Sequence, residues 1–202
     1  MSEKREPDLY PRLCQQIQTQ LHFQDEDASI AYSQDRFLPE MISEIEEKLD
    51  GETVFHRAFV PKLKLDILFG IKFPNHRHII LVLFEVKYLS QLALLNYSQL
   101  MGYLMVAQRI ELGILLNVIK GVPGNSTFSE DFADIVNNHA LPMDVDIHIN
   151  PANYGEHFRT GICSCVPNGR ITWETLSEMN GISGWQQLMM LCKERSSAFQ
   201  RE

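Results

Sequence analysis

The most constraining feature of this chain is the run from Ile79 to Lys87, Ile-Ile-Leu-Val-Leu-Phe-Glu-Val-Lys, which is apolar except at Glu85 and Lys87. A continuous apolar run bounded by polar residues is typical of a strand that is buried on both faces. Glu85 and Lys87 are two residues apart, so on a strand their side chains point to the same side. Because burying an unpaired carboxylate or ammonium is costly, we interpret these two residues as a functional site.

The segment before this run predicts a second strand. Residues 63–71 are mostly apolar and contain one carboxylate, Asp66. The connecting residues 73–77, Phe-Pro-Asn-His-Arg, are short and rich in turn formers, which favours an antiparallel hairpin. A further apolar strand is predicted at 112–119.

Between the hairpin and that last strand, the pattern predicts a helix. Ser90 can cap a helix that runs to about Gln108. The predicted inward stripe has spacings of three and four and consists of Leu92, Leu95, Gln99, Tyr103 and Val106. We therefore expect Gln99 and Tyr103 one turn apart, on the helix face that looks at the sheet.

These residues carry a resemblance to a known family. A strand with Asp66, a strand with Glu85-Val86-Lys87 and a helix with Gln99-Leu-Met-Gly-Tyr103 resemble, in this order, the PD-(D/E)xK nuclease superfamily. The Gln-xxx-Tyr spacing is similar to that of RecB-type exonuclease domains. The resemblance covers residues 36–120 and implies an α/β, restriction-endonuclease-like core, with a central mixed sheet of about four strands flanked by helices.

The chemistry of phosphodiester hydrolysis explains this residue set. It needs a metal to neutralise the phosphate, a polarised water and stabilisation of the leaving oxygen. Mg²⁺ prefers oxygen ligands and keeps several waters, so one or two carboxylates with the substrate phosphate suffice. The resemblance implies that Asp66 and Glu85 bind Mg²⁺, with Mn²⁺ as a substitute, joined by the carbonyl of Val86. Lys87 would orient or deprotonate the attacking water. A structural Glu85–Lys87 ion pair is the alternative.

Two further parts of the site are implied by the resemblance. Gln99 and Tyr103 would hold the site or the scissile phosphate from the helix side. The superfamily often takes another acidic ligand from a helix before the strands, and the predicted helix from about Pro39 to Asp50 offers Glu44. A solvated acidic helix face explains Glu44 as well.

The rest of the first 150 residues predicts ordinary elements. These are an amphipathic helix at 8–22, a polar loop at 24–35, a short strand at 53–60, a short helix at 129–138 and a strand at 143–150. In the last of these, Asp144, Asp146 and His148 share one face. They could ligate a metal, although the solvated side of a strand explains them equally.

The tail predicts a separate helical extension. Residues 172–179, 180–183 and 184–196 have the pattern of a helix, a tight turn and a second helix, which resembles a helix-turn-helix. Reading DNA and packing against the core or a partner protein both remain open. We therefore divide the chain into a nuclease-like domain at 1–150 and a C-terminal extension at 151–202.

Composition and charge indicate which partners and which location to expect for the protein. The formal net charge is −8, and 51–121 is the one segment in which Lys and Arg outnumber Asp and Glu, which suits a polyanionic substrate near the motif. No apolar run reaches the length of a membrane span and the N-terminus lacks an apolar signal core, so we expect a soluble, cytoplasmic protein.

The four cysteines, at 14, 163, 165 and 192, have the count of the iron–sulfur cluster in some RecB-like nucleases. Their spacing is wrong for a cluster or a zinc knuckle, since one residue separates Cys163 from Cys165. Free, reduced and mostly buried thiols are expected instead.

Together these features predict a Mg²⁺-dependent deoxyribonuclease that acts in restriction, defence, repair or with a mobile element. Its expected partners are DNA and other protein subunits, and one site per chain would require a homodimer to cut both strands. The alternative is a catalytically silent, nuclease-like subunit that binds a partner protein or DNA.

Overall fold

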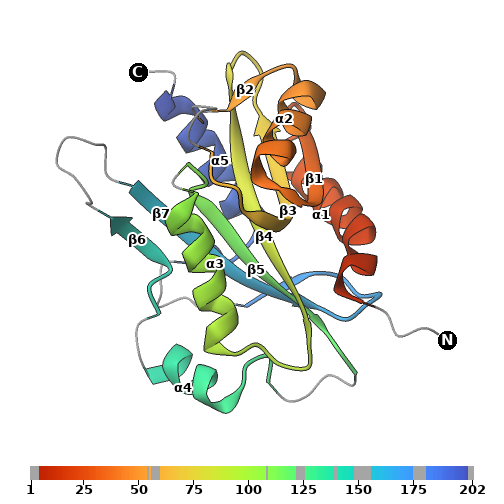
Figure 1. Ribbon diagram of the computed structural model, residues 1–202, viewed down its shortest axis with the longest axis vertical. Coiled ribbons are helices and arrows are strands. Elements are labelled where there is room, and N and C mark those ends of the chain that lie inside the picture. Colours follow the sequence, from red (N-terminus) through yellow and green to blue (C-terminus); the bar gives the residue numbers. More distant parts are fainter. Residues whose placement is uncertain are drawn as a thin grey trace. The chain divides into compact units, whose positions relative to one another are not determined.

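The computed structural model describes residues 5–53, 55, 60–107, 109–121, 126–138, 141–147, 156–174 and 181–199. The chain has an α/β fold with a mixed sheet flanked by helices (Figure 1). Among the described residues, eight strands join the sheet, in the order β1-β3-β4-β5-β7-β6 with β2 beside β4 and β8 beside β7, so the sheet has more strands than the four or so predicted. The chain divides into two compact units, residues 1–84 with 184–202 and residues 85–183.

The first unit contains both ends of the described chain. Its elements are the 3₁₀ helix η1 (Glu6–Leu9), α1 (Tyr10–Gln24), β1 (Ser29–Phe37), α2 (Leu38–Leu49), β2 (Glu52–Thr53), β3 (Lys64–Lys72), the first part of β4 (His78–Leu89) and α5 (Trp185–Phe199). Strand β3 is antiparallel to both β1 and β4, and β2 is parallel to β4.

The predicted hairpin is confirmed. Ile67 pairs with Phe84 and Ile71 pairs with Ile80, and the turn between the strands places Asn75 at φ 65°. Asparagine tolerates this left-handed conformation better than most residues. The strands are buried because nearly every side chain from Leu65 to Ile71 and from Ile79 to Phe84 is apolar.

The helix predicted from about Pro39 to Asp50 is confirmed as α2. Its buried residues are Leu38, Met41, Ile42, Ile45 and Leu49. They pack against β3, where Gly70 leaves room for the helix: a Cβ on Gly70 would overlap Ile45 Cγ2. In α1 the stripe of Leu13, Ile17 and Leu21 is buried as predicted.

The polar loop predicted at 24–35 is wrong, because β1 begins at Ser29. This strand is rich in polar residues and lies at the end of the strand order. Two of them have specific partners, since Ser33 Oγ donates to Glu44 Oε2 (2.6 Å) and Cys14 Sγ contacts Gln34 Oε1 (3.2 Å). Pairing with the apolar β3 therefore overrides the weak local strand signal.

The second unit contains the end of β4, α3 (Leu94–Val106), β5 (Leu112–Ile119), α4 (Glu130–Asn138), β6 (Asp144–Ile147), β7 (Glu156–Cys165) and β8 (Thr172–Trp173). Strand β7 is parallel to β5 and antiparallel to β6 and β8. The positions of β5, α4 and β6 agree with the prediction, whereas β7 was not predicted. Its polar residues Thr160 and Ser164 are buried between apolar ones, so its pattern neither alternates nor is continuously apolar.

Helix α3 begins three residues later than predicted, with Ala93 rather than Ser90 as its N-cap, and turns another face inward. It begins at Leu94, and its buried residues are Tyr97, Leu100 and Leu104. Leu95 is 77% exposed and Val106 is 55% exposed, so the predicted inward stripe is wrong. The helix is apolar on almost every side, and apolar spacing alone cannot choose a face in such a sequence.

The tail differs from a helix-turn-helix that begins at Thr172. Thr172 and Trp173 form β8 against β7, and residues 175–180 of the predicted first helix lie outside the described residues. Helix α5 belongs to the first unit, where it packs against α1 and Ser196 Oγ lies 2.6 Å from His76 Nδ1. The predicted domain boundary at residue 150 and most of the strand predicted at 53–60 also lie outside the described residues.

Within the part of the chain that the structure describes, every helix is too short or too polar to cross a membrane.

Candidate functional site

The strongest site feature in the second unit is the pair formed by Glu85 and Lys87 at the end of β4. The Glu85 side chain is 1% exposed and the Lys87 side chain is 14% exposed. Lys87 Nζ donates to Glu85 Oε1 at 2.5 Å, and Val86 between them is fully buried. The prediction that one strand buries a carboxylate beside an ammonium is confirmed.

A buried asparagine that was not predicted from the sequence steadies this end of β4. Asn117 on β5 is 0% exposed. In the amide orientation that satisfies its hydrogen bonds, its nitrogen donates to the carbonyls of Lys87 (3.2 Å) and Leu89 (3.3 Å). A polar residue inside the otherwise apolar run Leu-Gly-Ile-Leu-Leu-Asn-Val-Ile is the sequence signal for it.

Asp66 lies in the first unit, on β3. It is the residue before Ile67, whose partner across the hairpin is Phe84, and Glu85 is the residue after Phe84. Asp66 Oδ1 accepts a hydrogen bond from the Tyr10 hydroxyl at 2.8 Å. Tyr10 is the first residue of α1 and its hydroxyl also lies 3.3 Å from Glu6 Oε1. Neither Tyr10 nor Glu6 stood out in the sequence, since nothing local links them to Asp66.

Glu44, also in the first unit, is held by groups on β1 and α2. Its carboxylate accepts hydrogen bonds from Ser33 Oγ (2.6 Å) and Lys48 Nζ (2.7 Å), and Arg36 Nε lies 3.9 Å away. Partial burial alone would raise the pKa of Glu44, but the hydrogen bonds from Lys48 and Ser33 outweigh burial and hold that pKa below its ordinary value.

Glu44 and Tyr10 line the same hollow in the first unit, which has a volume of about 390 Å³. The other lining residues are Pro7, Tyr32, Ser33, Gln34, Asp35, Arg36 and Lys48. One of the lining residues, Tyr10, is thus the residue whose hydroxyl contacts Asp66. Nearby, Lys64 pairs with Asp35 at 2.7 Å, and that hydrogen bond, with the charge of Asp66, raises the pKa of Lys64.

Gln99 and Tyr103 lie one turn apart on α3, as their spacing predicts, but the prediction that they lie on the inward face of the helix is wrong. Gln99 Nε2 donates to the Tyr103 hydroxyl at 2.8 Å. Gln99 is exposed and Tyr103 is half-buried, in contrast to the buried side of the helix. The pair is thus available to a ligand that approaches α3 from solvent.

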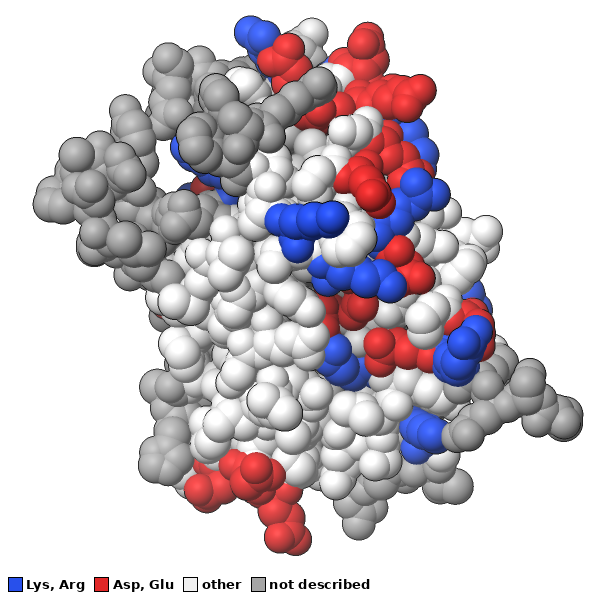
Figure 2. Space-filling model, viewed as in Figure 1, with Lys and Arg blue, Asp and Glu red and all other residues white. Residues whose placement is uncertain are grey.

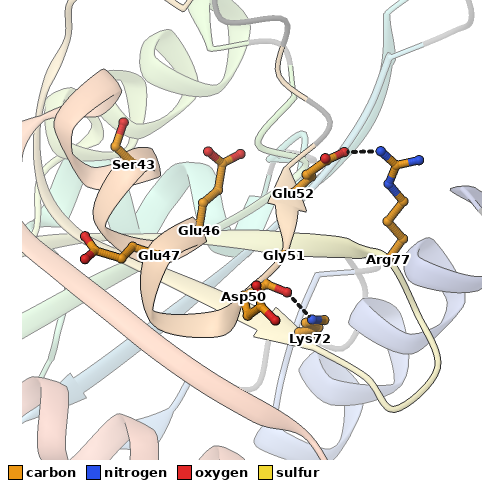
Figure 3. Close-up of a pocket in the computed structure, with 8 residues that line it drawn as sticks. All are labelled: Ser43, Glu46, Glu47, Asp50, Gly51, Glu52, Lys72 and Arg77. Atoms are coloured by element: carbon orange, nitrogen blue, oxygen red, sulfur yellow. Dashed lines mark hydrogen bonds and ion pairs between the residues drawn. The ribbon is translucent and has the colours of Figure 1, made fainter.

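A larger hollow of about 530 Å³ contains none of the predicted site residues (Figure 3). It lies at the end of α2, and its lining includes the acidic residues Glu46, Glu47, Asp50 and Glu52 and the basic residues Lys72 and Arg77. Arg77 pairs with Glu52 (2.7 Å), and Lys72 donates to the carbonyls of Leu49 and Asp50. These contacts close the end of the helix, so we interpret the hollow as structural.

The structure gives little support to the other candidate metal sites, namely the strand face with Asp144 and the four cysteines. Asp144 Oδ2 accepts from Arg159 Nη2 at 2.9 Å, and His148 lies outside the described residues. All four cysteines are buried thiols outside any disulfide, as expected, and lie on α1, β7 and α5. Among the described residues, no three His, Cys, Asp or Glu side chains gather to hold a metal. A Mg²⁺ site with two carboxylates and several waters needs no such group.

The surface charge is mixed on the face that Figure 2 shows. Side chains of both signs are interspersed over α1 and α2, whereas the area over α3 is uncharged. Helix α3 contains no charged residue. On this face, attraction of a polyanion would therefore depend on individual cations rather than on a continuous basic surface.

No protein-family model, no curated protein and no solved structure matches this chain. Its function must therefore be inferred from its own residues: the buried Glu85–Lys87 pair, the hydrogen-bonded Asp66 and the exposed Gln99–Tyr103 pair.

Proposed function

We propose that this chain is a Mg²⁺-dependent deoxyribonuclease of the PD-(D/E)xK type. The observation that carries the proposal is the buried carboxylate of Glu85 with the ammonium of Lys87 beside it, on a strand that is otherwise apolar. A buried ion pair often contributes no more to stability than apolar side chains of similar volume would, so its presence on this strand favours a functional role.

Asp66 and Glu85 are the proposed ligands of the metal, with the carbonyl of Val86. The hairpin register supports this choice, since the two acids directly precede and follow the paired residues Ile67 and Phe84. Their carboxylates are the hard oxygen donors that Mg²⁺ prefers. When bound, Mg²⁺ supplies charge neutralisation at the phosphate and lowers the pKa of a coordinated water.

Lys87 serves the attacking water in this proposal. Its hydrogen bond to Glu85 holds the ammonium at the end of β4, and 14% of the Lys87 side chain is exposed. A positioned ammonium can orient a water molecule and can donate to the phosphate oxygens as their charge grows. Asn117 holds the backbone of this strand end through the carbonyls of Lys87 and Leu89.

Gln99 and Tyr103 have an auxiliary role in the proposal. Their exposed hydrogen-bonded pair presents an amide and a phenol that can contact a DNA phosphate. Glu44 already accepts from Ser33 and Lys48, so we assign it to the structure of the first unit rather than to the metal. Cutting both DNA strands with one site per chain would require two copies.

Incubation with supercoiled plasmid tests the proposal. We expect nicking or linearisation with Mg²⁺ or Mn²⁺ and none with EDTA, and we expect both Asp66→Asn and Lys87→Gln to abolish it. Lys193→Gln is the matched control, because Lys193 is an exposed lysine on α5 that pairs with Asp25. Unchanged cutting by Lys87→Gln would refute the assignment of the site.

The non-enzymatic alternative has a distinct outcome. A silent nuclease-like subunit would cut no plasmid under any metal and would show no Mn²⁺ binding that depends on Asp66. Calorimetric titration of the wild type and Asp66→Asn with Mn²⁺ separates that result from an enzyme that requires a partner for activity.

A further inference from the structure

Tyr10 occupies an unusual position at the beginning of α1. Its side chain is 2% exposed, and its hydroxyl lies 2.8 Å from Asp66 Oδ1 and 3.3 Å from Glu6 Oε1. All three residues belong to the first unit. A buried phenol in contact with two carboxylates needs a chemical explanation, because simple core packing would be served better by phenylalanine.

The distances identify the main acceptor of the phenolic proton. A phenolic hydroxyl carries one proton, and an ionised carboxylate can only accept. The shorter distance assigns that proton to Asp66 Oδ1, and Glu6 is the more distant second acceptor. The bond engages Oδ1 and fixes the plane of the carboxylate, so the direction in which Oδ2 of Asp66 points is fixed as well.

The phenol itself is held firmly. Tyr10 begins a helix whose buried side continues through Leu13, Cys14, Ile17 and Leu21. Because Tyr10 is 2% exposed, the packing around its ring limits how far the hydroxyl can follow a displaced carboxylate. Hydrogen bonds from rigid neighbours to ligating carboxylates are the usual way in which proteins orient metal ligands.

We propose that Tyr10 is a positioning residue that orients the carboxylate of Asp66 for a divalent cation. The inference deepens the proposed function and rests on it. It assigns to the first helix a role in metal affinity that does not require any contact between Tyr10 and the metal or the DNA.

The test is Mn²⁺ titration calorimetry on the full chain, with the Tyr10→Phe variant. This change removes one oxygen and keeps the ring. We expect the Mn²⁺ dissociation constant to rise by about 10–100-fold. The metal concentration for half-maximal plasmid cleavage should rise by a similar factor, while the rate at saturating metal changes much less.

The chain offers a matched control in Tyr97, which is also 2% exposed. Its hydroxyl donates to the Pro142 carbonyl at 2.8 Å and lies 2.7 Å from Thr160 Oγ1, in the second unit. Tyr97→Phe removes a buried, hydrogen-bonded hydroxyl without touching Asp66. We expect similar losses of melting temperature in the two variants but a loss of Mn²⁺ affinity in Tyr10→Phe alone.

Each other outcome has a definite meaning. Wild-type affinity in Tyr10→Phe, together with lost binding in Asp66→Asn, would overturn the role of Tyr10 and leave the metal site standing. Equal losses of affinity in Tyr10→Phe and Tyr97→Phe would also overturn it, since they would indicate a general effect on folding. No Mn²⁺ binding by the wild type would overturn both proposals. Binding that depends on Asp66 but is not accompanied by cleavage would indicate a nuclease that requires a partner, and the Mn²⁺ affinity of Tyr10→Phe would still decide the role of Tyr10.

Discussion

Lys87 Nζ lies 2.5 Å from Oε1 of Glu85, and only 1% of the Glu85 side chain is exposed. The ammonium of Lys87 therefore neutralises a carboxylate that is costly to bury. In the proposed nuclease, where Lys87 also serves the attacking water, stability and activity are coupled through the same ammonium.

The Lys87→Met variant should reveal this coupling. Removing the ammonium while keeping an aliphatic chain should lower the free energy of unfolding by about 3 kcal/mol, because Glu85 stays buried. Urea denaturation at neutral pH measures the loss. Lys48→Met is the control, since the Lys48–Glu44 pair is 45% and 29% exposed and should contribute less than about 1 kcal/mol. Equally small losses of unfolding free energy in Lys87→Met and Lys48→Met would contradict the burial of the Glu85 carboxylate.

The Gln99–Tyr103 pair, in contrast, should matter for cleavage but hardly for stability. Because Gln99 is exposed, Gln99→Ala should change the free energy of unfolding by less than about 0.5 kcal/mol. If the pair supports the site, metal-dependent plasmid cleavage should fall by about tenfold or more. Ser98→Ala, one residue earlier on the exposed side of α3, should leave cleavage unchanged. If Gln99→Ala cleaves plasmid at the rate of the wild type, the Gln99–Tyr103 pair is not part of the proposed site.

Cys14 should make the protein sensitive to alkali. Burial raises the pKa of the Cys14 thiol from 9.0 to about 12. The unfolded chain therefore loses this proton first, so stability is present below about pH 9 and falls as pH rises toward 12. Between about pH 8 and pH 10 the expected loss from this thiol is about 1.4 kcal/mol.

Urea midpoints at the two pH values measure that loss. Cys14→Ser cannot titrate in this range, so its stability should fall by about 1.4 kcal/mol less than that of the wild type over the same interval. An identical pH dependence in both proteins would show that Cys14 does not contribute.

Replacing each of two glycines by alanine should change the free energy of unfolding in opposite directions. Gly70→Ala places a methyl group against Ile45 Cγ2 and should cost about 1–3 kcal/mol of unfolding free energy. Gly102 lies inside α3, where an added Cβ would meet nothing within 4 Å, so Gly102→Ala should stabilise by about 1 kcal/mol through helix propensity. Thermal denaturation measures both changes. Adding Ile45→Leu, which removes the offending Cγ2, should recover part of the Gly70→Ala loss.

Local pattern was sufficient for several elements. The run at Ile79–Lys87 predicted a buried strand with Glu85 inside it, and the turn formers at 73–77 predicted the hairpin. The buried stripe of α2 followed from its spacing. In each of these cases the information lies within a few residues, because strand alternation and helix periodicity are properties of the chain itself.

Long-range contacts decided the remainder. The polar β1 became a strand through its pairing with β3, and β7 did so through its pairing with β5 and β6. The uniformly apolar α3 could present several faces, and tertiary packing selected Tyr97, Leu100 and Leu104. Sequence alone thus determined the strand that carries Glu85 and Lys87. Only the tertiary structure brought Tyr10 to Asp66, because that contact joins two distant segments whose local patterns contain no information about each other.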